Sequence, residues 1–447
     1  MVKIYTLHKI VGLSFAAVLA LLAFTGFLLD HDKWSFLYTI TFKSVPQKSI
    51  EADKRLFEAY YIDKKNSDTV IAGGKRGLFK STDAGKHFEK ISSLQCNAIR
   101  EQKHTLYIAT SQGVYCYDFK KLTPLVLKNR YISSLALYEN KLVAVEEKER
   151  VYVVDIKSRK VTTSTEIFLP KEALQEDIKL SRFIRDLHYA RGLFDGDLSL
   201  FLNDYGALVL LWLSISGYII WYLIRSKQKA QFARKMIKTH ANIFVIFSIF
   251  PLFILLTTGI FLDHASALGK FMKSVTIPHK VLPPIYNTLK ADIWAVDYDG
   301  KVYRIGNRYG IYKSRDLNKW QLENRGFAYR MIRRGKRLYV SGMGAPNRIL
   351  DAKHFEILKN APHMFRDIIE KENRVEYFSP VQKSVKLPQF HEATLYSVLL
   401  TLHDGSFFAS WWIWVNDAAA LSLLLLLVSG FLRWRHKRKH FKYLFFK

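Results

Sequence analysis

The sequence predicts a membrane protein with both α and β structure: a four-helix transmembrane bundle that carries a large all-β, propeller-like outer domain. Three observations lead to this fold class. The chain of 447 residues contains four long apolar runs. Motifs around the first two runs recur around the last two, and one β-hairpin motif occurs in each of the two long segments between runs. We therefore expect a duplicated two-helix unit, with an outer domain built from both inter-helix segments.

The composition is strongly basic and also hydrophobic. Lys and Arg number 68 and Asp and Glu number 39, which gives a formal net charge of +29, and 49% of the residues are hydrophobic. Such hydrophobicity excludes a disordered chain. A basic excess that accompanies long apolar runs favours a membrane rather than nucleic acid as the partner.

The four apolar runs are each long enough to cross a bilayer. They cover residues 10–29, 206–224, 241–262 and 411–432, and a helix rising about 1.5 Å per residue needs about 20 residues for the hydrocarbon layer. The first run could also be a signal peptide. We expect a retained helix, because the run continues into Asp30-His31-Asp32-Lys33 without a small-residue cleavage site.

Charge predicts how these helices are oriented. The first nine residues, the link 225–240 and the tail 433–447 contain fifteen bases and no acid, so we expect them to be cytoplasmic. The protein is then a multi-pass protein of a bacterial inner membrane with both termini inside. The remaining residues keep an excess of 14 bases, which would attract an anionic substrate to the outer side.

This orientation divides the chain into five parts. We expect a first membrane helix, an outer β-rich segment, membrane helices two and three with a short basic link, a second outer β-rich segment, and a fourth membrane helix with a basic tail. Their boundaries are 1–31, 32–187, 188–264, 265–402 and 403–447.

An internal duplication places histidines in register. Residues 25–31 read TGFLLDH and residues 258–264 read TGIFLDH, and both helices begin near a histidine, His8 or His240. The second and fourth helices share three elements at a constant offset of 213 residues, namely Asn203-Asp204 with Asn416-Asp417, Ser216-Gly217 with Ser429-Gly430, and Trp221 with Trp434. A Leu-His pair precedes each of these helices, at His188 and His403.

Six histidines therefore form three symmetry-related pairs, and we predict that they ligate haem iron. The candidate ligands are His8, His240, His31, His264, His188 and His403. Two facing helices that each donate an imidazole form a bis-histidine site for a non-covalent b-type haem. We expect His8 and His240 to hold an inner haem and two of the other four to hold an outer one, with the remaining pair left for a further haem or incoming iron. The alternative is that the histidines lie at the membrane–water interface, where an amphipathic ring is partly exposed to water.

These motifs resemble the PepSY-associated transmembrane proteins. The resemblance rests on T-G-x-x-L-D-H, on L-H-K-x-x-G at residues 7–12, and on the Leu-His before a helix that ends in S-G-x-x-x-W. Some members of that family are inner-membrane ferrisiderophore reductases with b-type haem on transmembrane histidines. The resemblance implies electron transfer across the membrane to an outer acceptor, but it does not extend to the outer segments, which lack a PepSY-like α/β pattern.

The outer segments show the pattern of propeller blades. Residues 77–83 read GLFKSTD and residues 310–316 read GIYKSRD, and the first continues into a motif like the Asp-box hairpin of β-propellers. Three blades are visible in the first segment and two in the second, so we predict one shared propeller of five to seven blades. Separate small β domains are the alternative.

Cysteine content limits the remaining options. The two cysteines, Cys96 and Cys116, form no C-x-x-C motif, so zinc knuckles, thioredoxin-type chemistry and covalent haem attachment are excluded. A disulfide between them is a candidate, and two buried thiols are the alternative.

The predicted function is a haem-dependent ferric reductase. No catalytic residue can be assigned from the sequence, and no dinucleotide fingerprint or cytoplasmic domain is present. Electrons would come from a membrane quinol or an acidic flavodoxin- or ferredoxin-type donor, and would pass through about two b haems to a ferric chelate or siderophore. The alternative is a non-enzymatic membrane-anchored propeller that binds a ligand or a partner protein.

Overall fold

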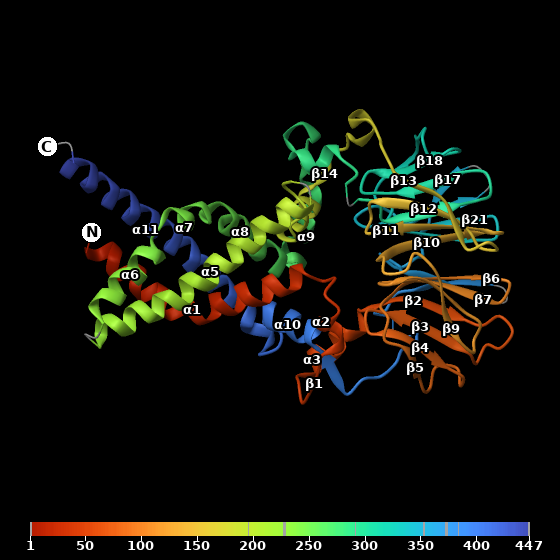
Figure 1. Ribbon diagram of the computed structural model, residues 1–447, viewed down its shortest axis with the longest axis horizontal. Helices are drawn as coiled ribbons and strands as arrows, with labels where there is room; N and C mark the ends of the chain where they lie inside the picture. Colours follow the sequence, from red (N-terminus) through yellow and green to blue (C-terminus); the bar gives the residue numbers. More distant parts are fainter. Residues whose placement is uncertain are drawn as a thin grey trace.

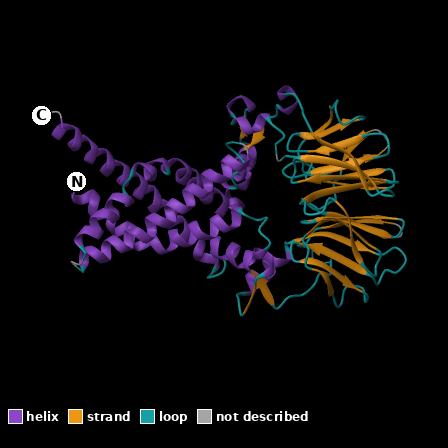
Figure 2. Ribbon diagram, viewed as in Figure 1, coloured by secondary structure: helices purple, strands orange, loops and turns teal. Residues whose placement is uncertain are grey.

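The computed structural model describes residues 2–194, 196–226, 229–290, 292–351, 354–371, 374–382 and 384–445. A helical bundle and a β-rich body lie side by side along the long axis of the molecule, and both termini are at the end of the bundle remote from the β-rich body (Figure 1). Almost all strands belong to the β-rich body, whereas the bundle is wholly helical (Figure 2). We call these parts the bundle and the β-body, and the two ends of the bundle the terminal end and the β-body end.

The bundle contains three helices that are long and apolar enough to cross a membrane, or four spans if a bent helix pair counts as one. Its helices are α1 (Val2–Asp30), α5 (Gly196–Arg225), α6 (Ala230–His240), α7 (Ile243–Phe247), α8 (Ile249–Asp263) and α11 (Ile413–Phe445). One apolar cluster joins α1, α5, α8 and α11, with Leu19, Leu210, Leu256 and Leu423 among its buried members. Large apolar side chains such as Phe250 and Leu421 are exposed on the outside of the bundle, as expected for lipid-facing positions.

The third apolar run, residues 241–262, is divided between α7 and α8 rather than forming one straight helix. Residues 230–247 and Ile249–Asp263 are long and apolar enough to cross a membrane only when the two helices are taken as one span. A bend of 73° lies between them. The bend lies at Ser248, between α7 and α8. A separate cap begins α7, where the Asn242 side chain accepts a hydrogen bond from the Val245 amide. The basic link is itself helical, since α6 packs Ala233 and Met236 against Leu223 of α5.

The β-body consists, within the described residues, of five four-stranded antiparallel sheets and one two-stranded sheet. The first segment forms sheet 1 with β2 (Phe57–Ile62), β3 (Val70–Gly74), β4 (Gly77–Ser81) and β5 (Glu89–Ser92), sheet 2 with β6 (Cys96–Gln102), β7 (Thr105–Thr110), β8 (Gly113–Tyr117) and β9 (Leu122–Val126), and sheet 3 with β10 (Ile132–Tyr138), β11 (Lys141–Glu146), β12 (Arg150–Asp155) and β13 (Lys160–Glu166). The second segment forms sheet 4 with β16 (Ala295–Tyr298), β17 (Tyr303–Gly306), β18 (Gly310–Ser314) and β19 (Gln321–Arg325), sheet 5 with β20 (Arg330–Arg334), β21 (Arg337–Ser341), β22 (Arg348–Asp351) and β23 (His354–Ile357), and sheet 6 with β24 (Asp367–Lys371) and β25 (Arg374–Phe378).

These six sheets close into a propeller-like ring. The first strand of each sheet contacts the first strand of the next, and β24 returns to β2. An apolar cluster fills each space between neighbouring sheets, including the space between sheets 3 and 4, where Val143 from one segment packs with Val296 from the other. Both segments therefore contribute to one β-rich body, because neither has enough sheets to cover its own open faces.

The recurrent hairpin motif is structural. Ser81 and Asp83 lie between the third and fourth strands of sheet 1, where the Asp83 carboxylate accepts hydrogen bonds from the Lys86 and His87 amides at 3.0 and 2.9 Å. In sheet 4 the Asp316 carboxylate accepts hydrogen bonds from the Asn318 and Lys319 amides, and these amides lower the pKa of Asp316 to about 2. These carboxylates satisfy turn amides, which fixes the hairpin.

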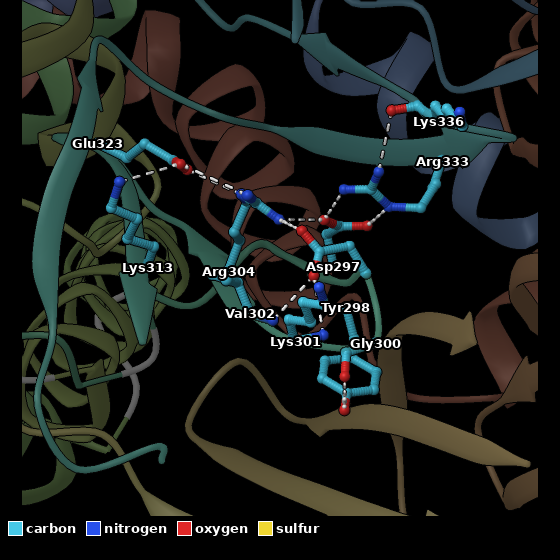
Figure 3. Close-up of polar contacts among 11 residues, drawn as sticks. Asp297, Tyr298, Gly300, Lys301, Val302, Arg304, Lys313, Glu323, Arg333 and Lys336 are labelled. Atoms are coloured by element: carbon cyan, nitrogen blue, oxygen red, sulfur yellow. Dashed lines mark hydrogen bonds and ion pairs between the residues drawn. The ribbon is translucent and has the colours of Figure 1, made fainter. Parts of the chain in front are cut away.

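Buried ion pairs join sheets 4 and 5 (Figure 3). Asp297 on β16 is 2% exposed and accepts hydrogen bonds from Arg333 Nε at 2.8 Å and from Arg304 Nη1 at 3.3 Å. Arg304 also pairs with Asp299 and Glu323. Two guanidinium groups thus share one buried carboxylate, which compensates their desolvation.

Short elements connect the bundle to the β-body. They are α2 (Phe36–Thr39), β1 (Thr41–Lys43), α3 (Gln47–Lys54), η1 (Lys171–Leu174), β14 (Ile178–Lys179), α4 (Leu180–His188), α9 (Ala265–Ser274), β15 (Thr276–Ile277), η2 (His279–Val281), η3 (Pro284–Asn287), β26 (Glu392–Thr394), α10 (Leu395–His403) and η4 (Ser410–Trp412). Strand β1 pairs with β26 and β14 pairs with β15, both antiparallel. Each strand pair thus joins a segment that leaves the bundle for the β-body to a segment that returns from the β-body to the bundle.

Candidate functional site

Two histidines lie inside the terminal end of the bundle, and we call them the terminal pair. His8 is near the start of α1 and His240 is the last residue of α6. Nδ1 of His8 is 2.8 Å from the Ser429 hydroxyl of α11, and Nδ1 of His240 is 2.7 Å from the Ser216 hydroxyl of α5. Because α6 folds back along α5, His240 reaches a serine that lies nine residues before the end of α5. Both imidazoles are therefore placed within the bundle rather than on its surface.

Two other histidines meet at the β-body end, and we call them the junction pair. His188 ends α4 and His403 ends α10, and their ring centroids are 6.3 Å apart. Nδ1 of His188 is 3.0 Å from the Thr258 hydroxyl, and Nδ1 of His403 is 2.8 Å from the Thr25 hydroxyl. Burial, with a smaller contribution from His403, lowers the pKa of His188 to about 3, which keeps its ring neutral.

The hydroxyl partners determine which ring nitrogen carries the proton. Each hydroxyl also lies near a carbonyl oxygen of its own helix, as Thr25 does at 2.7 Å from Leu21 and Ser429 at 2.6 Å from Leu425. The other two hydroxyls contact carbonyls three or four residues earlier, Thr258 that of Ile254 and Ser216 that of Leu213. A hydroxyl has one proton to donate. If the hydroxyl donates this proton to the carbonyl oxygen of its own helix, its oxygen must accept a hydrogen bond from the Nδ1–H group of the histidine. We assign this tautomer from the hydrogen-bond network. In this tautomer the free lone pair is on Nε2, which is therefore the nitrogen able to bind a metal ion.

Every one of these four contacts crosses between the duplicated halves. His8 and His188 belong to the first half, and their hydroxyl partners Ser429 and Thr258 belong to the second. His240 and His403 belong to the second half, and Ser216 and Thr25 to the first. The arrangement repeats under exchange of the halves, so the histidine–hydroxyl contacts fix how the two halves of the bundle assemble.

A glycine follows each hydroxyl and leaves room for the ring. A Cβ at Gly26 would lie 3.2 Å from Cε1 of His403, and a Cβ at Gly259 would lie 3.7 Å from Cε1 of His188. At the terminal pair, a Cβ at Gly430 would lie 3.6 Å from His8 and one at Gly217 would lie 3.9 Å from His240. The Ser/Thr-Gly dipeptide thus supplies a hydrogen bond at four positions, and at Gly26 the glycine is also needed for space because a Cβ there would be tighter than ordinary contact.

A cavity of about 700 Å³ opens between the members of the terminal pair. Its size is within the range of about 300–1,000 Å³ that is typical of ligand and cofactor sites. Its lining includes His8, His240 and the glycines Gly12, Gly217 and Gly430. The lining also contains four bases and no acid, the bases being Lys9, Arg225, Lys238 and Arg433.

The residues present fit b-type haem. The terminal pair offers two imidazoles and a large apolar cavity, and the bases in its lining suit the two carboxylates of a haem. The centroid separation of the junction pair is near what one metal ion with bonds of about 2 Å to each ring would give. Among the described residues no group of three or more His, Cys, Asp or Glu side chains could hold a metal ion. Each pair would offer two imidazoles to the iron of a haem, which would supply one-electron chemistry.

The remaining two candidate histidines contact carboxylates instead. Nε2 of His264 is 2.7 Å from Asp417, and Nε2 of His31 is 3.6 Å from Asp204, while His31 Nδ1 lies 2.8 Å from the Phe27 carbonyl. The structure therefore does not join them to the junction pair. Of the four histidines considered for the outer site, it brings together His188 and His403.

The Asn-Asp motif explains this sorting. The side-chain amide of Asn203 donates to the His188 carbonyl at 3.1 Å, and that of Asn416 donates to the His403 carbonyl at 3.1 Å. In each motif the asparagine holds the end of the junction helix, and the following aspartate holds the histidine at the end of α1 or α8.

Buried aspartates anchor both junction helices to neighbouring elements. Asp53 on α3 is fully buried and accepts hydrogen bonds from the hydroxyls of Thr394 and Ser397 beside and within α10, and from Arg76 of sheet 1 at 2.6 Å. On the other side, Asp186 of α4 accepts a hydrogen bond from Tyr286 at 2.7 Å and lies 3.6 Å from Arg308 of sheet 4. The β-body thus positions the two helices that carry the junction histidines.

The four hydroxyls are functional residues that the sequence presents only as parts of duplicated motifs. They belong to Thr25, Thr258, Ser216 and Ser429. The signal that distinguishes them is a Ser/Thr-Gly dipeptide repeated once in each apolar run. Their pairing with histidines of the opposite half depends on the helix packing, so it is visible only in three dimensions.

The candidate disulfide is not formed, because Cys96 and Cys116 are both free. Cys96 is on β6 and Cys116 is on β8, with β7 between them in the same sheet. Two strand spacings of about 4.8 Å place such residues about 10 Å apart, which exceeds the reach of a disulfide. The Cys116 thiol instead contacts the Thr123 hydroxyl at 2.9 Å.

Comparison with known proteins gives one family and several distant structures. The family model described as the PepSY-associated TM region matches residues 101–437, and no curated protein matches the chain. The computationally designed Ika8 protein aligns with a TM-score of 0.33 at 9% identity, over 72% of this chain and 80% of that one. YCF48 from Cyanidioschyzon merolae aligns with the same score and identity, over 72% and 78%. Likenesses this weak carry no argument about function.

Proposed function

The chain belongs to the family of PepSY-associated transmembrane proteins, and from this premise we propose that it is a b-type haem protein that passes electrons through a membrane to a ferric chelate. In this proposal each electron reduces one ferric ion to ferrous iron. The β-body is a six-bladed propeller on the acceptor side of the membrane. The reaction class is oxidoreductase, and the acceptor is a ferric chelate or siderophore used in iron uptake.

One observation carries the proposal. Four half-buried imidazoles are held at Nδ1 by hydroxyls, two at each end of the same bundle. A bound b haem at each pair would supply reversible one-electron chemistry. His8 and His240 would hold one, and His188 and His403 the other. The hydroxyls fix the orientation of the imidazole rings, and the glycines allow each ring to lie close to the neighbouring helix.

The two pairs are spaced to bridge a bilayer. On α1, His8 belongs to the terminal pair, and Thr25 contacts the junction pair seventeen residues later. At about 1.5 Å per residue this is about 26 Å of helix, comparable to the hydrocarbon thickness of about 30 Å. Electrons entering at one face can thus leave at the other without a mobile carrier.

The basic terminal end would face the cytoplasm. There the bases that line the cavity would steer an acidic flavodoxin- or ferredoxin-type donor, and a membrane quinol is the alternative donor. A topology reporter fused after Lys447, which lies outside the described residues, is expected to be active only in the cytoplasm. Activity only on the opposite side would reverse the assignment of donor and acceptor faces.

The decisive experiment is the absorption spectrum of the purified full-length chain. We expect a Soret band and sharp α and β bands after reduction with dithionite, and rapid reoxidation by a ferric chelate. A chain without these bands, although folded and inserted in the membrane, would overturn the proposal and leave a membrane-anchored binding protein.

Variants then assign the haems. His8→Ala combined with His240→Ala should lose the terminal haem and keep the junction haem, because the ligands of the latter are at the far ends of the helices. The double variant should retain about half the haem absorbance and no longer carry electrons from a cytoplasmic donor. His87→Ala, at an exposed β-body histidine, is the control and should keep full haem content. Full haem and full reduction in the double variant would contradict the assignment.

A further inference from the structure

A cationic and aromatic surface lies next to the junction pair, on the side of sheets 3 and 4. The ammonium group of Lys148 is 3.4 Å from the ring centroid of Trp294. The guanidinium of Arg191 is 5.9 Å from the same centroid and 5.9 Å from that of Tyr189. Both cations therefore lie near one indole ring, which places two positive charges beside a single aromatic side chain.

Neither cation is neutralised in the structure. Within the described residues, no carboxylate is within ion-pair distance of Lys148 or Arg191, although their neighbours Lys33 and Glu147 do pair. Asp292 is near Lys148 but is paired with Arg308 at 2.7 Å. Burial, and then the charge of Arg191, lowers the pKa of Lys148 well below its ordinary value. Asp32 and Asp292 act in the opposite direction, and an anion bound beside Lys148 would likewise favour its charged form. Such an anion would then meet two cations that have no ion-pair partner among the described residues.

Buried aromatic rings support Trp294 from inside the β-body, since Phe327 and Tyr329 are 6% and 8% exposed. Trp294 contacts Phe327 and Tyr329, with ring centroids 5.3 and 5.9 Å away. Arg330 lies 4.6 Å above Tyr329, and its charge is shared with Glu58 at 2.8 Å. These buried groups hold the indole of Trp294 in place, and the accessible part of the surface is formed by Tyr189, Arg191 and Trp294.

The surface is continuous with the junction pair. Tyr189 directly follows His188, and the two ring centroids are 5.8 Å apart. From His188 the contacts run through Tyr189 and Arg191 to Trp294. Tyr189 is 49% exposed and Arg191 is exposed, so a ligand can reach this surface from solvent and lie within two side chains of an iron ligand.

We propose that Lys148, Arg191 and Trp294 form the binding site for the electron acceptor, a polyanionic ferric chelate with flat aromatic arms. This inference rests on the proposed function, since it identifies the substrate class of the reductase. The two free cations recognise the negative charge, and the indole and phenol rings pack against the arms. The site is a feature of the β-body and its junction, and the transmembrane motifs contain none of its residues.

A redox-inert probe tests the site without requiring electron transfer. Gallium(III) tris-catecholate carries a charge of −3, and gallium(III) desferrioxamine B carries +1 with the same metal. Binding of each to the full-length protein in detergent is measured by equilibrium dialysis with gallium quantified by mass spectrometry. We expect saturable binding of the anionic complex and none of the cationic one. Equal binding of both, or binding of neither, would overturn the proposal.

Variants locate the binding. Lys148→Gln and Arg191→Gln are each expected to weaken binding of the anionic complex about tenfold, as expected for the loss of one charge-assisted contact. Lys148→Arg should restore most of it. Lys157→Gln is the control, because Lys157 is exposed in the turn at the opposite end of β12, and it should bind like the unmodified protein. Unchanged binding in the combined Lys148→Gln and Arg191→Gln variant would disprove the site.

The outcome is separable from that of the proposed function. Haem content and dithionite reduction are measured on the same preparations. If the protein contains no haem but its binding of the anionic complex depends on Lys148, the proposed reductase function is refuted and the proposed binding site is supported. If the protein contains haem but the variants bind the complex unchanged, the binding site is refuted and the reductase function is supported.

Discussion

The Thr25 hydroxyl lies 2.8 Å from Nδ1 of His403, although 378 residues separate them in the chain. The same hydroxyl lies 2.7 Å from the Leu21 carbonyl of its own helix. When its proton goes to that carbonyl, the oxygen accepts from the imidazole and sets its tautomer. A single threonine thus couples helix α1 to the imidazole of His403 at the end of α10.

Thr258→Val is expected to weaken haem binding at the junction pair. The substitution removes the oxygen that accepts from His188 Nδ1 while keeping nearly the same shape, and loss of such an outer partner costs about 10–100-fold in metal affinity. The measurement is haem stoichiometry and the midpoint potential of the junction haem by spectroelectrochemistry.

Thr257→Val is the matched control for this change. Thr257 is the preceding residue on α8, is half-buried, and donates a hydrogen bond to the Phe253 carbonyl at 2.8 Å. The control should retain haem and potential. Equal behaviour of the two variants would mean that the hydroxyl contact with His188 has no effect on the site.

Gly26→Ala should perturb the junction site in a second way. The added methyl group would lie 3.2 Å from Cε1 of His403, which is tighter than ordinary contact, so the ring must shift. We expect a changed reduced α band and partial loss of junction haem. Gly269→Ala, where a Cβ meets nothing within 4 Å, should be neutral or stabilise α9 by up to about 1 kcal/mol. Identical spectra for both variants would argue against the packing role of Gly26.

Asp53→Ala is expected to destabilise the connection between bundle and β-body. It leaves the guanidinium of Arg76, which is 8% exposed, without its closest carboxylate, and loss of one partner of a buried pair costs about 3–5 kcal/mol. Limited proteolysis in the connecting segments and the apparent Tm report the effect. Glu51→Gln on the same helix removes only the exposed pair with Lys48, so its effect should stay below about 1 kcal/mol. Similar Tm values for both variants would show that Asp53 is not an anchor.

Alkylation will count the free thiols. Denaturation in iodoacetamide without reductant should add two carbamidomethyl groups to the chain, because Cys96 and Cys116 are on non-adjacent strands. In the native state Cys116 should react before Cys96, which is fully buried. Labelling that requires prior reduction would show that the two cysteines are bonded.

The sequence by itself determined most of the local organisation. Run length and apolar composition identify the segments able to cross a membrane, because the bilayer dictates both. The hairpin motif at Ser81 and Asp83 is equally local, since its carboxylate satisfies amides three and four residues away. The duplication also singles out the six histidines, because it repeats them in register along the chain.

The tertiary structure decided what these residues contact. A bend at Ser248 divides the third apolar run into α7 and α8, and a hydropathy average does not register it. The choice of His188 and His403 over His31 and His264 depends on which carboxylate or hydroxyl each ring meets. Those partners come from other helices and from the opposite half of the duplication, so the contacts exist only once the helices have packed. Long-range pairing of this kind leaves no periodicity along the chain, which is why only the folded structure reveals it.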